Sequence, residues 1–123
     1  VHKFVPHASV PSYLRLADFG LAPYQPVPSR KYGAPIKVSE YLASGLPVVI
    51  TANIADDSKL ISEYGIGAVL STLSSSEYLN AVKVIDGLLK DNAELHIYRK
   101  IKEIALQERS FSMAAKLYRE IYG

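Results

Sequence analysis

Short apolar runs alternate with amphipathic stretches over the first half of the chain. Apolar, partly β-branched runs bounded by Gly or Pro are typical of buried strands, and four occur: Val1–Val5, Asp18–Pro23, Leu46–Thr51 and Gly67–Leu70. Helical spacing of apolar residues lies between them, in Val10–Ala17, Pro35–Ser44 and Asp56–Tyr64. Because strands that alternate with helices are joined by crossovers, the pattern predicts an α/β fold with a short parallel sheet of about four strands.

The rest of the chain, from Ser74 to Gly123, has a helical pattern. Ser74–Glu77 is typical of a helix start, and breaks near Asp91–Asn92 and Ser110 divide this tail into three helices. The sequence has no internal repeat and no low-complexity segment. We therefore predict one α/β domain with a helical C-terminal tail. Since the chain begins with Val1 inside a predicted strand, we expect it to be a fragment of a longer protein.

A long loop leads into the helix that carries the most informative polar residues. The loop Tyr24–Ala34 contains two prolines and Gly33, and loops of this length in compact domains are functional or disordered. In the helix Pro35–Ser44, Lys37 and Glu40 share one face. The helix macrodipole disfavours a cation in the first turn, unless an anion binds the free amides at the same helix start. Because ligands of open α/β sheets bind beyond the carboxyl ends of the strands, we predict an anion site there.

Each of these features also has a purely structural interpretation. Lys37 and Glu40 can form a surface i,i+3 pair, and Arg30–Lys31 can be a solvated part of the loop. The nine tyrosines fit core edges with hydrated hydroxyls as well as a sugar-stacking surface. Residue spacing alone leaves these alternatives open.

Composition excludes several classes of protein. The 123 residues contain no cysteine, so the chain has no disulfide framework and no thiolate metal site, which fits a reducing compartment. His2, His7 and His96 lack paired metal-site spacing and are given no ligand role. The apolar run Leu46–Ile50 is far shorter than the roughly 20 residues that span a bilayer. The formal net charge of +2 does not indicate a nucleic-acid partner.

The segment Pro35–Val49 reads PIKVSEYLASGLPVV. It resembles the P-x-K-x-x-E-Y-x-A-x-G-x-P-V-V segment of GT-B glycosyltransferases of the group 1 or family 4-like type. Weaker similarity continues upstream, in Val10–Pro23, and downstream, in Ile61–Leu70, so the resemblance covers roughly residues 1–72. It implies a Rossmann-like three-layer α-β-α fold. It also implies that residues 1–123 form a single, partial C-terminal domain, the nucleotide-sugar-binding domain of a two-domain enzyme.

The resemblance further implies roles for individual residues. Glu40 matches the second Glu of the family's Glu-x7-Glu motif, which hydrogen-bonds the donor's ribose; a carboxylate suits this role because it accepts from two vicinal hydroxyls. Lys37 matches a residue that contacts the nucleotide in some relatives, and we expect this contact to be with the diphosphate. The other predicted donor-site residues are Tyr32, Gly33, Ala34, Ile36 and Tyr41. Tyr32 stands where the first Glu of the motif is expected, so retention or inversion at the sugar stays open.

These residues lead us to expect a glycosyltransferase fragment for polysaccharide biosynthesis that binds a UDP- or GDP-linked sugar without a metal or cofactor. The expected acceptor is a glycan or lipid-linked molecule. The N-terminal domain of the family, with any catalytic residue, is absent from the chain, so the fragment alone is expected to be inactive. We expect no nucleic-acid partner. The expected location is cytoplasmic, with peripheral contact at the inner face of the membrane.

Two other hypotheses remain. The absent first Glu favours a non-catalytic nucleotide-binding or assembly module of degenerate glycosyltransferase type. A receiver-like or other flavodoxin-type regulatory domain shares the alternation of strands and helices. It needs an acidic cluster after its first strand, and His2–His7 offers none.

In a complete domain of the resembled family, Val1–Val5 would lie beyond two strands that this chain lacks. The strand at Phe19–Ala22 would then lose its natural neighbour and expose unpaired backbone groups, and such edges recruit other chains. Either Val1–Val5 pairs with Phe19–Ala22, or two copies join their sheets. We favour the first for a dilute monomer because closing a short loop costs little entropy.

Overall fold

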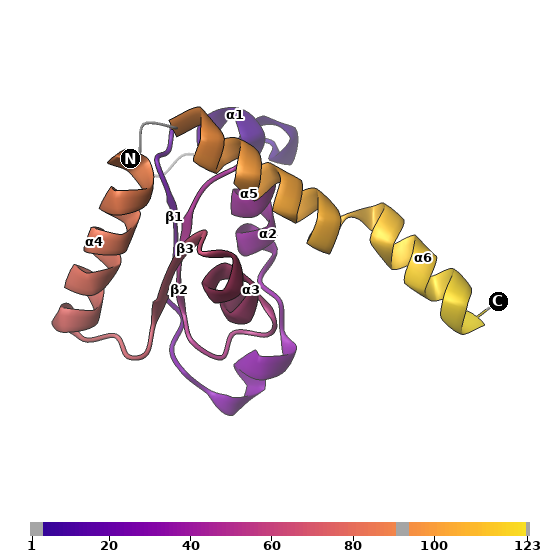
Figure 1. Cartoon of the computed structure of the whole chain (residues 1–123). Coiled ribbons are helices and arrows are strands. Elements are labelled where there is room, and N and C mark those ends of the chain that lie inside the picture. Colours follow the sequence, from indigo (N-terminus) through magenta and orange to yellow (C-terminus); the bar gives the residue numbers. More distant parts are fainter. Residues whose placement is uncertain (1–3, 91–93, 123) are drawn as a thin grey trace.

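The computed structural model describes residues 4–90 and 94–122 of the chain. Its elements are η1 (His7–Ser9), α1 (Val10–Leu14), β1 (Gly20–Ala22), η2 (Pro28–Tyr32), α2 (Ile36–Ala43), β2 (Val48–Thr51), α3 (Asp57–Tyr64), β3 (Gly67–Leu70), α4 (Ser75–Lys90), α5 (Glu94–Arg109) and α6 (Phe111–Tyr122) (Figure 1). Strands and helices alternate from β1 to α4, as the hydrophobic pattern predicts.

The sheet has three parallel strands in the order β1-β2-β3. Leu21 of β1 pairs with Val49 of β2, and Val49 pairs in turn with Ala68 of β3. The predicted α/β fold with a parallel sheet is thereby confirmed. Within residues 4–90 and 94–122 the sheet has three strands, where about four were predicted.

The strand predicted at Val1–Val5 accounts for this difference. Phe4 and Val5 lie outside any strand or helix, and residues 1–3 lie outside the described part of the chain. The Phe4 side chain is fully exposed. An apolar run becomes a strand only where a neighbouring strand satisfies its backbone N–H and C=O groups. Among the described residues β1 is paired with β2, and Phe4 and Val5 are paired with neither strand.

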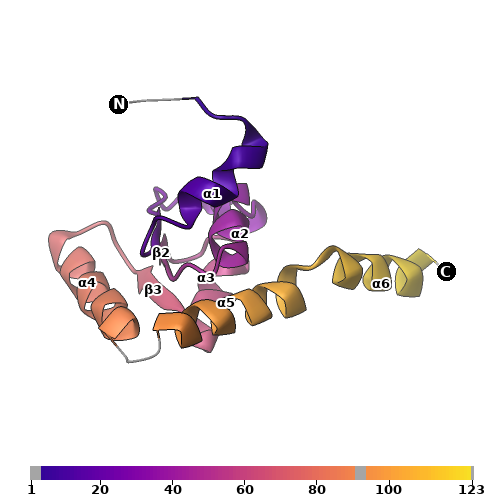
Figure 2. The same cartoon turned by 90° about the horizontal axis from the view of Figure 1, so that it is seen from above.

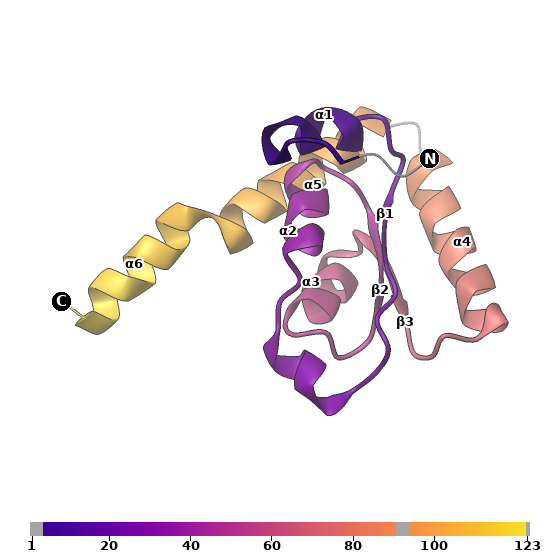
Figure 3. The ribbon, with the colours of Figure 1, turned by 180° about the vertical axis from the view of Figure 1, so that it is seen from behind.

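Helices cover both faces of the sheet (Figures 1 and 3): α2, α3 and α5 lie on one face and α4 lies on the other. The central strand β2 is buried along its whole length. Its Val48 and Ile50 join the core formed with α2, α3 and α5, whereas Val49 joins a second cluster under α4. This three-layer α-β-α arrangement is Rossmann-like, as predicted, and it explains why β2 is continuously apolar.

Glycines end α2 and α3 at the predicted positions. Gly45 and Gly65 have φ angles of +81° and +60°, the left-handed conformation in which helices commonly stop. A Cβ atom built on Gly45 would lie 2.8 Å from the backbone oxygen of Tyr98. Gly45 therefore also allows α5 to approach the end of α2 closely.

Other boundaries differ in detail from the prediction. Helix α1 ends at Leu14 rather than Ala17, and the loop Tyr24–Ala34 contains the short 3-10 helix η2. The predicted break at Ser110 separates α5 from α6, which extends away from the body of the domain (Figure 2). The break near Asp91–Asn92 lies outside the described residues. Within the described residues, no helix combines the length and the apolar character needed to cross a membrane.

Candidate functional site

The loops after β1 and β2 meet at the carboxyl edge of the sheet, at the lower end of the domain in Figure 1. The Tyr24 amide donates a hydrogen bond of 2.8 Å to Oγ1 of Thr51, the fully buried last residue of β2. The Ala55 amide donates to the backbone oxygen of Arg30 over 3.0 Å. These bonds fix the long loop against the connection between β2 and α3, next to the start of α2.

Two cations flank the ring of Tyr24. Lys37 Nζ lies 4.8 Å and Arg30 Cζ lies 4.9 Å from the ring centroid, distances at which a cation is attracted to an aromatic face. Burial raises the pKa of the Tyr24 hydroxyl, the Arg30 charge opposes the rise, and the Asp57 charge adds to it. At neutral pH Tyr24 therefore keeps its proton and can donate a hydrogen bond.

Glu40 has a different partner. Its Oε1 lies 2.9 Å from Nε2 of His7, and the His7 side chain is 87% exposed. Lys37 faces Tyr24 and Glu40 faces His7, so the structure replaces the surface i,i+3 pair with two separate contacts. Because exposed ion pairs contribute little to stability, a hydrogen-bond donor of a ligand can displace His7 from the Glu40 carboxylate.

A groove of about 540 Å³ runs between α2 and α5. It is lined by His7, Ile36, Ser39, Glu40, Ala43, Lys102, Ala105, Leu106, Arg109 and Ser110. Ile36 and Leu106 are 77% and 68% exposed, so the groove has an uncovered apolar surface beside the Glu40 carboxylate. This combination suits a ligand with one flat apolar part and several hydroxyls.

The predicted site residues lie on two sides of α2 and on the segment before it. Ile36 and Glu40 line the groove, whereas Lys37 lies beside Tyr24. Gly33 and Ala34 are exposed, and they precede a helix whose first residues receive no side-chain cap. Tyr32 is 90% exposed on η2. Tyr41 is half-buried and packs against the core, as a core-edge tyrosine does.

Sequence reasoning missed a buried ion pair beside this site. Arg109, at the end of α5, donates from its NH2 group to Asp57 Oδ1 over 2.8 Å. The Asp57 side chain is 1% exposed, and its Oδ2 has no hydrogen-bond partner among the described residues. Burial raises the pKa of the Asp57 carboxyl group, while the charge and hydrogen bond of Arg109 oppose the rise. The two residues are 52 positions apart, so no local pattern reveals the pair.

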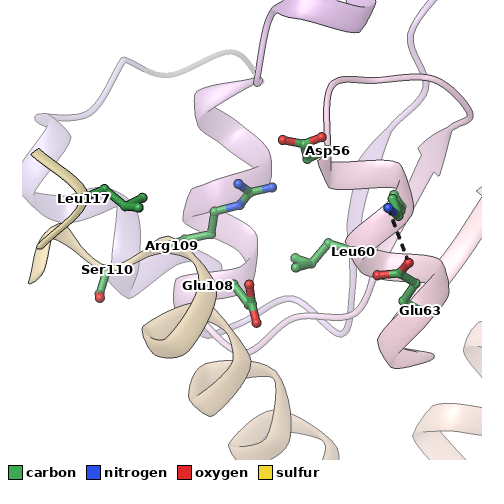
Figure 4. Close-up of a pocket in the computed structure, with 8 residues that line it drawn as sticks. Asp56, Leu60, Glu63, Glu108, Arg109, Ser110 and Leu117 are labelled. Atoms are coloured by element: carbon green, nitrogen blue, oxygen red, sulfur yellow. Dashed lines mark ion pairs between the residues drawn. The ribbon is translucent and has the colours of Figure 1, made fainter. Parts of the chain in front are cut away.

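Figure 4 shows the cavity on the other side of this pair. Its volume is about 510 Å³, and it lies between α3 and the junction of α5 with α6. Charged residues of α3 and α5 line it. Two of them, Lys59 and Glu63 of α3, form an ion pair of 3.7 Å. In the described part of the chain, no three His, Asp or Glu side chains come close enough together to hold a metal ion.

An open parallel sheet with helices on both faces, and with loops and helix starts gathered at its carboxyl edge, defines a domain of the Rossmann-like class; folds of this class bind their ligands at that edge. Residues 1–103 match the family model described as Glucosyltransferase 3-like, C-terminal domain. The chain belongs to this glycosyltransferase family, and the predicted relation to a glycosyltransferase C-terminal domain is confirmed.

A curated relative agrees with this assignment. The chain is 42% identical over 55 residues to the putative teichuronic acid biosynthesis glycosyltransferase TuaH of Bacillus subtilis (strain 168). The matched stretch is 45% of this chain and 14% of the relative, so the chain corresponds to a small part of that protein's length. No solved structure matches the chain.

Proposed function

We propose that this chain is part of the donor-binding domain of a GT-B, group 1 or family 4-like glycosyltransferase and that it binds a UDP- or GDP-linked sugar. The observation that carries the proposal is the position of Lys37 and Glu40 on α2. The two residues lie about one helical turn apart: Glu40 lines the open groove, and Lys37 lies beside Tyr24, whose amide is bonded to the last residue of β2. Family membership supports the proposal.

Each residue has a chemical task in this proposal. Glu40 accepts hydrogen bonds from the ribose hydroxyls, which replace His7 on one carboxylate oxygen. Lys37 and the free amides at the start of α2 bind the diphosphate. Ile36, the first residue of α2, supplies one of these amides. Gly33 and Ala34, which lack bulky side chains, let the phosphates approach the backbone.

Transfer of the sugar leaves a nucleoside diphosphate, whose developing charge must be stabilised in the transition state. In the proposal Lys37 and the α2 dipole supply this stabilisation. The acceptor, a glycan or lipid-linked molecule, and the catalytic base belong to an N-terminal domain of the full-length protein. We place that protein in the cytoplasm, with peripheral contact at the inner face of the membrane.

One observation favours a second function. Tyr32, at the position of the first Glu of the motif, is 90% exposed and has no carboxylate to offer the sugar. A non-catalytic module that holds a nucleotide or serves assembly would tolerate this change. Turnover of a nucleotide sugar by the full-length protein distinguishes an enzyme from such a module.

The donor site is tested by titrating the ¹⁵N-labelled chain with UDP and with GDP. We expect the amide signals of Gly33, Ala34 and residues 36–40 to shift first. The affinity should be weak, because the affinity falls tenfold for each ~1.4 kcal/mol of binding energy that an absent domain would supply. Shifts confined to α4, α5 and α6 would contradict the proposal.

A further inference from the structure

The groove between α2 and α5 contains a cation that has no task in the proposed donor site. Arg109, the last residue of α5, lines this groove together with Glu40 and Ile36. The same side chain also lines the cavity of Figure 4. Arg109 lies beyond residues 1–103, which the family model matches, so the match itself assigns it no role.

Asp57 holds the guanidinium group of Arg109, which lines the groove. Asp57 is the first residue of α3, and the hydrogen bond between the two side chains is 2.8 Å long. Because Asp57 is buried and its second oxygen has no partner among the described residues, its charge depends on Arg109 for compensation. The Arg109 side chain is 30% exposed. A guanidinium has five N–H donors, so this bond leaves donors for a ligand.

The guanidinium lies close to two helix starts, where a phosphate group is favoured. Helices α2 and α3 both begin at the carboxyl edge of the sheet, and helix starts favour an anion. Arg109 reaches the first residue of α3, and the first residue of α2, Ile36, lines the same groove. Glu40 lies about one turn, ~5.4 Å, further along α2. A nucleotide with its ribose on Glu40 would therefore extend its phosphates toward Ile36 and Arg109.

We propose that Arg109 binds the diphosphate of the nucleotide-sugar donor and that Asp57 is its positioning residue. This inference rests on the proposed function. Arginine forms charge-assisted, often bidentate hydrogen bonds with phosphate. Lys37 and Arg109 then bind the diphosphate from two sides of the start of α2, and the buried carboxylate of Asp57 keeps the guanidinium oriented before the ligand arrives.

The test compares the binding of UDP with uridine, and of GDP with guanosine, to the full-length protein by titration calorimetry. Arg109→Gln is expected to weaken diphosphate binding about tenfold to a hundredfold, as the loss of a charge-assisted hydrogen bond does. Nucleoside binding should change less than about twofold. Arg99→Gln is the matched control, because Arg99 is exposed on the same helix and outside the groove. It should leave both affinities unchanged.

Two further variants separate binding from stability. Arg109→Gln leaves the Asp57 carboxylate buried without its partner, so the double variant Asp57→Asn/Arg109→Gln removes both charges. We expect the double variant to show the same selective loss of diphosphate binding with a smaller fall in Tm. Asp57→Asn alone should lower the ratio of diphosphate to nucleoside affinity, which a purely structural role of Asp57 would not change.

The opposite results identify what has failed. Unchanged diphosphate affinity in the Arg109 variants, or an equal loss for the nucleosides, would overturn the inference and leave Arg109 as a tie between α5 and α3. If Glu40→Gln and Lys37→Ala still weaken diphosphate binding in that case, the proposed function stands. If the full-length protein binds neither UDP nor GDP, the proposed function and the inference are both wrong.

Discussion

Glu40 and His7 are 33 positions apart in the chain, and their side chains meet at 2.9 Å on the rim of the groove between α2 and α5. The contact brings the segment before β1 next to the helix that carries the predicted ribose-binding carboxylate. Because His7 is almost fully exposed, the pair is easily exchanged for a ligand hydroxyl. The groove is thus bounded by parts of the sequence that lie far apart.

Glu40→Gln in the full-length protein should lower turnover of the nucleotide-sugar donor while leaving thermal stability nearly unchanged. An exposed pair contributes at most about 0.5–1 kcal/mol, so the loss of the contact with His7 has a small effect on folding. Donor kinetics and thermal unfolding measure the two quantities. The control is Glu63→Gln, which removes the exposed pair with Lys59 on α3 and should affect neither strongly. Full turnover in the Glu40 variant would show that this carboxylate does not bind the donor.

Asp57→Asn should change the pH dependence of the unfolding free energy. Burial raises the pKa of Asp57 in the folded protein above its ordinary value of 3.8, so in the window above this value the folded chain retains a proton that the unfolded chain has lost. The stability contributed by this proton is fully present below 3.8 and is lost as the pH rises through the raised pKa.

The unfolding free energy of the wild type should therefore fall relative to that of Asp57→Asn as the pH rises through this window. Urea unfolding at a series of pH values measures the difference. If the unfolding free energy of the wild type instead rises relative to that of Asp57→Asn as the pH increases, attraction to Arg109 outweighs burial and the pKa of Asp57 is lowered.

Gly45→Ala should destabilise the domain and loosen the contact of α5 with α2. The residue has a φ angle of +81°, where a Cβ atom costs roughly 1–2 kcal/mol, and the added atom would press on the backbone of Tyr98. Chemical unfolding measures the loss. Gly87→Ala is the control, because a Cβ atom on this α4 residue meets nothing within 4 Å and should stabilise the helix by up to about 1 kcal/mol. Equal stability of the two variants would contradict this explanation.

The edge of β1 should recruit a second copy of the chain. β1 pairs with β2 on one side. The Gly20 amide points to that side, since it donates to the backbone oxygen of Pro47. Successive amides of a parallel strand point alternately to its two sides. The Leu21 amide therefore faces the open edge, and the Leu21 side chain borders an apolar groove of about 360 Å³ with Phe19 and α4. We expect sedimentation to show association with rising concentration and the hydrogen exchange of Leu21 to slow with it.

A strand from the chain's own beginning would protect Leu21 at every concentration. Phe4 and Val5 do not form such a strand, so the described residues argue against pairing of the first segment of the chain with β1. A monomer at all concentrations, with a freely exchanging Leu21 amide, would show that both versions are wrong.

The sequence by itself determined the elements whose cause is local. Continuous apolar residues predict β2, because a strand buried on both faces needs them. Gly45 and Gly65 predict the ends of α2 and α3, because a left-handed residue stops a helix at low cost only when it lacks a Cβ atom. The shared face of Lys37 and Glu40 follows from helical spacing, and the motif around them predicts a glycosyltransferase C-terminal domain.

Tertiary structure decided which of these residues meet. Helical spacing allowed Lys37 and Glu40 to pair with each other, but packing gave Lys37 the ring of Tyr24 and gave Glu40 the imidazole of His7. The pairing of Asp57 with Arg109 depends on α5 crossing α2 and α3, and a separation of 52 residues leaves no periodic trace in the chain. The number of strands was decided in the same way, because an apolar run at Phe4 and Val5 becomes a strand only when another strand lies beside it.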